Sequence, residues 1–120
     1  MPSRFYTLVV DARDPAALAQ FWKDVLDWET IYESSDEVVI AKNGNQYPGL
    51  VFGTVPEEKQ IKNRLHIDLA PDDRDAEVER IIALGATHAD VGQSGDEGWV
   101  VLADPEGNEF CVLSAREGGM

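Results

Sequence analysis

The chain repeats one pattern of residues, and this repeat constrains the fold more than any other feature. A β-rich run, Phe5–Val10, is followed by Asp14 and an amphipathic segment. A second run, Leu65–Leu69, is followed by Asp73 and another amphipathic segment, 59 residues further along this 120-residue chain. Because the offset is almost half the chain, the sequence predicts two equivalent modules. Clefts between such halves commonly bind ligands, so we expect a binding cleft.

Each of the two aspartates is expected to cap a helix. Asp14 precedes a proline, which is favoured at the first helical position, and this predicts a helix over Pro15–Asp27. Asp73 precedes a second helix, about Arg74–Leu84, which a glycine ends. The apolar residues of the first helix have the spacing of a buried face and are expected in the core: Leu18, Phe21, Trp22, Val25 and Leu26.

Short β-rich runs complete a βαβββ order in each half. Turn residues at 43–45 and 105–108 fall at matching places in the two halves. Residues 56–63 form a polar connection, and Gln93–Gly98 is expected to be a glycine-containing loop. The remaining strands are expected at Trp28–Glu33, Val38–Ala41, Leu50–Val55, Ala86–Val91, Trp99–Leu102 and Glu109–Leu113.

Composition excludes several classes of protein. The formal charge is -13, with 23 acidic and 10 basic residues, so we expect no nucleic-acid partner. This charge would attract a cationic ligand, or it serves solubility alone. No apolar run is long enough to span a membrane, and we expect no secretory signal, because the first residues lack a basic stretch followed by an apolar one. A lone cysteine, Cys111, fits a reducing cytoplasm.

Three segments carry a family resemblance: Asp14-Pro15 with the helix that follows, Lys62–Leu69, and Asp104–Leu113. Together they resemble the vicinal oxygen chelate superfamily, which contains glyoxalase I, extradiol dioxygenases and bleomycin-resistance proteins. The glyoxalase-like branch is the most similar. The resemblance covers about residues 4–114.

The resemblance implies an α+β fold in which two βαβββ modules form a curved eight-stranded mixed sheet around a cleft. The helices would lie on the outer side of that sheet. The modules would comprise about residues 4–55 and 64–114 of a single domain, 1–120. Family members of this size usually pair, and exposed edge strands need covering, so a homodimer is expected.

In metal-dependent members of the superfamily, side chains on the first and last strands of each half hold the metal. The resemblance places these positions at Thr7, within Leu50–Gly53, at His66 and at Cys111. Only His66 is an expected ligand type, because threonine binds metals poorly and Cys111 is a soft donor where a carboxylate is usual. Since catalytic sites normally have three protein ligands, we expect no tightly bound metal and no other cofactor.

A rearranged divalent-metal site stays open as an alternative. It would combine His66 and Asp68 with Cys111 and Glu109, because residues two apart on a strand point to the same face. Each pair is separated by about 6–7 Å along its strand, which is long for one small ion.

Alternation along the second repeated strand sends Arg64, His66 and Asp68 to one face. If Leu65 and Ile67 face the helices, that face lines the cleft. His66 would then contact the ligand or transfer a proton, and it is the best catalytic candidate. The alternative is a polar group inherited from a metal-binding ancestor. Arg64 binds an anion or, as the favoured alternative, pairs with Asp68 or with another of the many carboxylates.

Two aromatic residues, Phe52 and Trp99, are on strands that should curve around the cleft, where they would stack on a ligand. Ordinary packing is the alternative for both. Cys111 lies between two apolar residues and is most simply a small apolar side chain, the alternative being a nucleophile with His66 as base. The predicted ligand-binding residues are therefore Thr7, Phe52, Arg64, His66, Trp99 and Cys111.

Two functions are compatible with these residues. The first is binding or sequestration of a small organic ligand without a metal, as the resemblance to bleomycin-resistance proteins implies. The second is a lyase, isomerase or dioxygenase that depends on a metal or uses His66 as acid or base. The first is favoured, because the sequence does not identify a nucleophile, a base and an orienting group that would act together.

Overall fold

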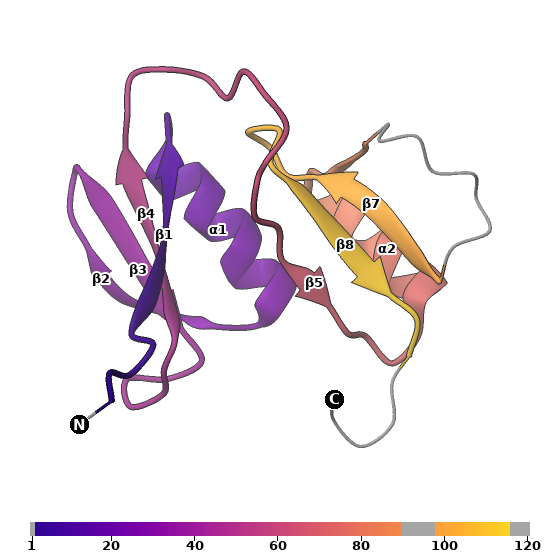
Figure 1. The fold of residues 1–120 in the computed structure, drawn as a ribbon, viewed down its shortest axis with the longest axis horizontal. Coiled ribbons are helices and arrows are strands. Elements are labelled where there is room, and N and C mark those ends of the chain that lie inside the picture. Colours follow the sequence, from indigo (N-terminus) through magenta and orange to yellow (C-terminus); the bar gives the residue numbers. More distant parts are fainter. Residues whose placement is uncertain (1, 90–97, 116–120) are drawn as a thin grey trace. The chain divides into compact units, whose positions relative to one another are not determined.

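The computed structural model describes residues 2–89 and 98–115. The chain divides into two compact units, Met1–Glu58 and Lys59–Met120. Within the described residues, each unit has one helix and a four-stranded mixed sheet (Figure 1). The element order is βαβββ in both, which confirms the predicted α+β fold of two such modules. The boundary falls inside the predicted polar connection at 56–63.

The first sheet has the spatial order β1 (Thr7–Ala12), β4 (Gly49–Thr54), β3 (Glu37–Ala41) and β2 (Glu29–Glu33). β1 runs parallel to β4, and the other neighbours are antiparallel. The helix α1 (Pro15–Leu26) contacts β3 and β4, and its apolar face closes the core of this unit. The largest side chains buried there are Leu18, Phe21, Trp22, Ile40 and Phe52.

The second sheet repeats this order with β5 (Asp68–Leu69), β8 (Glu109–Leu113), β7 (Trp99–Ala103) and β6 (Thr87–His88). β5 is parallel to β8, and the remaining pairs are antiparallel. The helix α2 (Arg74–Leu84) contacts β8. The core of this unit is built from Val78, Ile81, Leu102, Phe110 and Val112.

Both predicted helix caps are confirmed. The Asp14 carboxylate accepts a hydrogen bond from the backbone N–H of Ala17 at 3.1 Å. The Asp73 carboxylate accepts one from the backbone N–H of Ala76 at 3.2 Å. The first helix ends one residue earlier than predicted, at the left-handed residue Asp27, whose φ is 56°. Both helix starts therefore follow from a local signal in the sequence.

The first strand of each module begins later than predicted. In the first module, pairing with β4 starts at Thr7, and the residues before it are exposed. In the second module, β5 starts only at Asp68. Leu65 is 76% exposed, so the prediction that it faces the helices was wrong. Within the described residues, the strand expected at 86–91 pairs with β7 at Thr87–His88 only. The end of that expected strand and most of the loop expected at 93–98 lie outside the described residues.

The turn between β7 and β8 is organised by one buried carboxylate. Asp104 is 4% exposed, and its Oδ1 accepts the backbone N–H groups of Glu106 at 2.9 Å and Asn108 at 3.0 Å. The Asn108 amide also donates to both Asp104 oxygens, at 3.2 and 3.0 Å. Gly107 has a φ of 89°, which favours glycine. These contacts explain the Asp-Pro-Glu-Gly-Asn segment as a structural turn that sets the start of β8.

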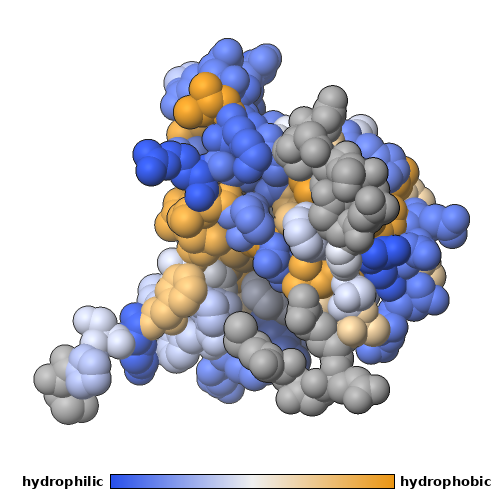
Figure 2. All heavy atoms as spheres, turned by 45° about the vertical axis from the view of Figure 1, so that its right-hand side comes forward, coloured by the Kyte–Doolittle hydropathy of each residue, from blue (hydrophilic) through white to orange (hydrophobic). Residues whose placement is uncertain are grey.

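The surface combines hydrophilic and hydrophobic side chains, as Figure 2 shows. No helix in the described part of the chain is long and apolar enough to cross a membrane. Exposed large apolar residues occur in both units, among them Phe5, Tyr6, Val9, Ile31, Tyr32, Ile61, Leu65 and Trp99.

We expect Asp104→Ala to destabilise the protein by about 2–4 kcal/mol, because it leaves buried N–H donors without an acceptor. Asp104→Asn keeps one carbonyl oxygen for the two backbone donors and should cost less. Urea unfolding of both variants measures the difference. Equal stability of the alanine variant and the unmutated protein would contradict this role for the turn.

Candidate functional site

One face of the second sheet collects the polar candidates. Asp68 is paired with Cys111 in the β5–β8 ladder, and Val101 is paired with Cys111 in the β7–β8 ladder. Paired residues point to the same side of a sheet, as do residues two apart. Trp99 and Leu113, a further cross-strand pair, therefore share this side, which we call the site face. Phe110 and Val112 point to the other side and are almost fully buried.

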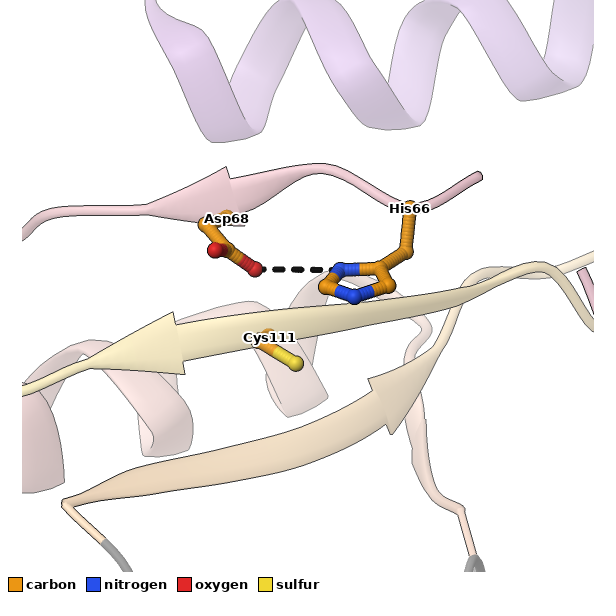
Figure 3. A group of neighbouring side chains, drawn as sticks. All are labelled: His66, Asp68 and Cys111. Atoms are coloured by element: carbon orange, nitrogen blue, oxygen red, sulfur yellow. Dashed lines mark ion pairs between the residues drawn. The ribbon is translucent and has the colours of Figure 1, made fainter. Parts of the chain in front are cut away.

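Three side chains converge on the site face to form the His66 cluster, defined as His66, Asp68 and Cys111 (Figure 3). His66 Nδ1 lies 3.0 Å from Asp68 Oδ1, and the two side chains are 44% and 48% exposed. At this distance the Asp68 carboxylate is the acceptor for an Nδ1–H, which leaves Nε2 as the second ring nitrogen. One donor atom from each of the three residues lies within 4.8 Å of the others.

The third member of the cluster is held as a protonated thiol. Burial raises the pKa of Cys111, and the charge of Asp68 and a hydrogen bond from the thiol to that carboxylate raise it further. The nearby Lys62 ammonium lowers the pKa of the thiol, with a smaller effect. A nucleophilic cysteine needs a lowered pKa and a base of its own. Because His66 is paired with Asp68, it does not act as a base for the thiol. The geometry therefore favours the interpretation of Cys111 as a small apolar side chain.

The segment that leads to His66 is fastened to β8 by Glu109. Lys59 Nζ lies 3.0 Å from Glu109 Oε2, and these side chains are only 20% and 15% exposed. The backbone N–H of Asn63 donates to Glu109 Oε1 at 2.9 Å, and its side-chain amide donates to the Glu109 carbonyl at 3.1 Å. Burial alone would raise the pKa of Glu109, but these hydrogen bonds and the Lys59 charge outweigh it and lower the pKa.

This fastening produces a bulge in front of β5. A continued parallel register would place His66 opposite Glu109, because Asp68 is opposite Cys111. Asn63 contacts Glu109 instead, through hydrogen bonds that involve a side chain, so Arg64, Leu65 and His66 lie between this anchor and Ile67, whose carbonyl accepts from the Cys111 N–H at 2.9 Å. Strict strand alternation therefore does not extend back from Asp68, which is why Leu65 is exposed.

The His66 cluster offers one nitrogen, one oxygen and one sulfur donor to a metal ion. In a tetrahedral zinc site the donor atoms are about 3.5 Å apart, given bond lengths of 2.0–2.3 Å. The separations of up to 4.8 Å would close with a shift of about 1 Å, so the residues fit a divalent ion. The objection that strand spacing is too long was wrong for His66 and Asp68, because their side chains reach toward each other. Glu109 turns instead to Lys59.

The other predicted site residues are placed as follows. Trp99 is 42% exposed on the site face, diagonal to Cys111. Arg64 is exposed in the bulge, and within the described residues Asp68 pairs with His66 rather than with Arg64. Phe52 is fully buried in the first unit, which favours the packing alternative. Thr7 begins β1 in the same unit, and its place in a shared ligand site stays a prediction.

The predicted ligand-binding residues did not include Asp68 or Glu109, which the sequence suggested only as donors of the alternative metal site. Lys59 and Lys62 were predicted in no site role. The available signal was an acidic residue two positions after His66, together with a run of cationic residues before it. The contacts of Glu109 could not be found this way, since they depend on the fastening of a loop to a distant strand.

A family model described as a glyoxalase-like domain matches residues 7–113. No curated protein matches the sequence.

Several solved structures share the fold at low sequence identity. A glyoxalase/bleomycin resistance protein/dioxygenase family enzyme from Burkholderia phytofirmans is 22% identical, with a TM-score of 0.71, and the match covers 92% of this chain and 97% of that one. A mutant of the fosfomycin resistance protein FosX from Listeria monocytogenes, in complex with Mn(II) and dihydroxypropylphosphonic acid, is 19% identical, with a TM-score of 0.72 and coverage of 98% and 93%. The bleomycin-binding protein from Streptomyces verticillus, in complex with copper(II)-bleomycin, is 19% identical, with a TM-score of 0.60 and coverage of 97% and 99%.

We expect Glu109→Gln to lower the free energy of unfolding by about 1–3 kcal/mol at pH 7, because the ion pair with Lys59 is largely buried. Since the pKa of Glu109 is lowered by folding, its contribution is present above the unfolded pKa of about 4.3 and is lost as the pH falls through the folded value. Urea unfolding from pH 7 down to about pH 3 should show the two proteins converging below about pH 4.3. Glu33→Gln, at an exposed position on β2, is the matched control. A difference that does not depend on pH would refute the ionic role.

Proposed function

Because the chain belongs to the glyoxalase-like domain family, we propose that it binds a small organic ligand on the site face of its second unit. The ligand contacts the His66 cluster at its polar end and Trp99 along its apolar body. This reading retains the prediction made from the sequence and assigns the contacts to particular side chains. The bleomycin complex and the FosX complex show that proteins of this fold bind small molecules of different chemistry.

One observation carries the proposal: an exposed ion pair and an exposed tryptophan share one sheet face. His66 and Asp68 are each nearly half exposed, and Trp99 is 42% exposed. Diagonal cross-strand neighbours are about 7–8 Å apart, so one small ligand could reach both Trp99 and the His66 cluster. Binding sites typically combine apolar walls with a few fixed polar groups.

His66 is the ligand-contacting group best placed for chemistry. Asp68 accepts from Nδ1 and fixes the ring orientation, so Nε2 is the nitrogen that accepts a proton from a ligand or donates a hydrogen bond to it. A proton-transfer reaction would use the same contact. Replacing His66 should therefore weaken ligand binding while leaving the protein folded.

We expect a thermal-shift screen of small organic molecules to find compounds that raise the melting temperature. For such a compound, His66→Ala should weaken binding about tenfold or more, because a contact worth at least 1.4 kcal/mol is lost. Since His66 is exposed, the variant should change stability by only about 0.5 kcal/mol. His88→Ala, at an exposed position on β6, is the matched control. Unchanged affinity in His66→Ala would rule out this site.

A divalent-metal enzyme is the second candidate, favoured by the convergence of three donor atoms within 4.8 Å. His66, Asp68 and Cys111 would hold the ion, which supplies Lewis-acid chemistry when bound. Binding would release the Cys111 proton, because the thiolate is the ligand form. This candidate uses the same side chains and predicts a lyase, isomerase or dioxygenase instead of a binding protein.

Metal analysis of protein purified without chelators or nickel resin separates the two candidates. We expect a metal content well below one per chain and, after addition of Co(II), no thiolate absorption band, because an ion would have to displace the Cys111 proton and draw together donor atoms up to 4.8 Å apart. A stoichiometric metal that survives dialysis and is lost in Cys111→Ser would favour the enzyme. Cys111→Ala serves as a second variant without any donor.

We also infer a homodimer in the cytoplasm, on the sequence arguments given above. The edge strand β2 supports the first inference, because Ile31 and Tyr32 are 44% and 53% exposed on it.

A further inference from the structure

A basic segment lies beside the His66 cluster in an otherwise acidic protein. Residues 59–66 contain Lys59, Lys62, Arg64 and His66 and no carboxylate. The whole chain has 23 acidic residues against 10 basic ones, so this stretch departs from the composition around it. The charge of the chain as a whole is thus a poor guide to the charge at the site.

Within the described residues, two members of this segment are paired with carboxylates and two are not. Lys59 is paired with Glu109, and His66 with Asp68. Within residues 2–89 and 98–115, no ion pair or hydrogen bond engages the charged groups of Lys62 and Arg64, and both residues are exposed. The carboxylates of Glu109 and Asp68, on the site face, already have partners. Among the residues that the structure describes, the charges of Lys62 and Arg64 therefore remain available to a ligand.

The backbone around these charges is fixed on the sheet. Asn63 is fastened to Glu109 on one side, and the Ile67 carbonyl is bonded to Cys111 on the other. Lys62 precedes the first of these anchors and Arg64 follows it, so both side chains start from defined positions beside the site face. Their common neighbour Asn63 is anchored to Glu109, two residues before Cys111 on β8, which places the backbone of Lys62 and Arg64 near the His66 cluster.

We propose that the site takes a small organic anion, whose acidic group pairs with Lys62 and Arg64 and whose apolar body lies against Trp99. This inference rests on the proposed ligand site and specifies the ligand class. Arginine and lysine recognise carboxylates and similar anions, and arginine does so through two parallel hydrogen bonds. The inference replaces the cationic ligand that the formal charge of -13 suggests.

Three probes with the same ring and different charge test the proposal: benzoate, benzylamine and benzyl alcohol. Chemical-shift changes in nuclear magnetic resonance spectra give their affinities at neutral pH. We expect benzoate to bind more tightly than the other two and to weaken with added salt, because the contact is ionic and exposed. Lys62→Gln and Arg64→Gln should each lower benzoate affinity about fivefold, which corresponds to about 1 kcal/mol. Neither variant should weaken the binding of benzyl alcohol.

Lys42→Gln is the matched control, since it removes the same charge from an exposed position in the first unit. It should leave benzoate affinity unchanged. Tighter binding of benzylamine, equal binding of all three probes, binding of none of them, or an equal loss in the control would overturn the inference. The broader proposal of a ligand site fails by a different result, namely that His66→Ala leaves the affinity for every compound from the thermal-shift screen unchanged.

Discussion

The contacts of Glu109 determine how the second unit presents its polar residues. This side chain holds Lys59 and Asn63 against the start of β8, and the chain contacts the same strand again at Ile67, four residues after Asn63. The short distance between the two attachments forces the intervening chain to bulge. Arg64 and His66 consequently stand beside the sheet instead of forming part of a regular ladder. A largely buried ion pair is costly to break, so this arrangement is stable as long as Glu109 is ionised.

The architecture was predictable because its signals are local. Asp14 and Asp73 are each followed by helical periodicity, and a cap acts within three residues. The convergence of His66 and Asp68 was not predictable from strand spacing, because that spacing describes backbone positions and side chains can reach across it. Phe52 shows a second limit of prediction from the sequence. Its type suits both a ligand wall and a core, and only the register of β4 decides that it is buried.

The distribution of charge along this chain matters more than its sum. Acidic residues on the outside of both units contribute most of the formal charge of -13 and favour solubility. Screening limits the reach of such exposed charges to about 8–10 Å in physiological salt. A ligand at the site face therefore responds mainly to nearby groups, where the carboxylates of Asp68 and Glu109 are already paired. Lys62 and Arg64 then outweigh a larger but more distant negative charge.

Asp68 determines which chemistry the His66 cluster can perform. It is paired with the imidazole of His66, and its charge adds to burial in raising the pKa of the Cys111 thiol. The sulfur is consequently a weak nucleophile, and the reactive atom offered to a ligand is Nε2 of His66. A metal ion would have to replace the proton of Cys111 and draw the three donors together. The two candidate functions thus use the same side chains in different protonation states, and the balance between them depends on how strongly this one carboxylate retains its two donors.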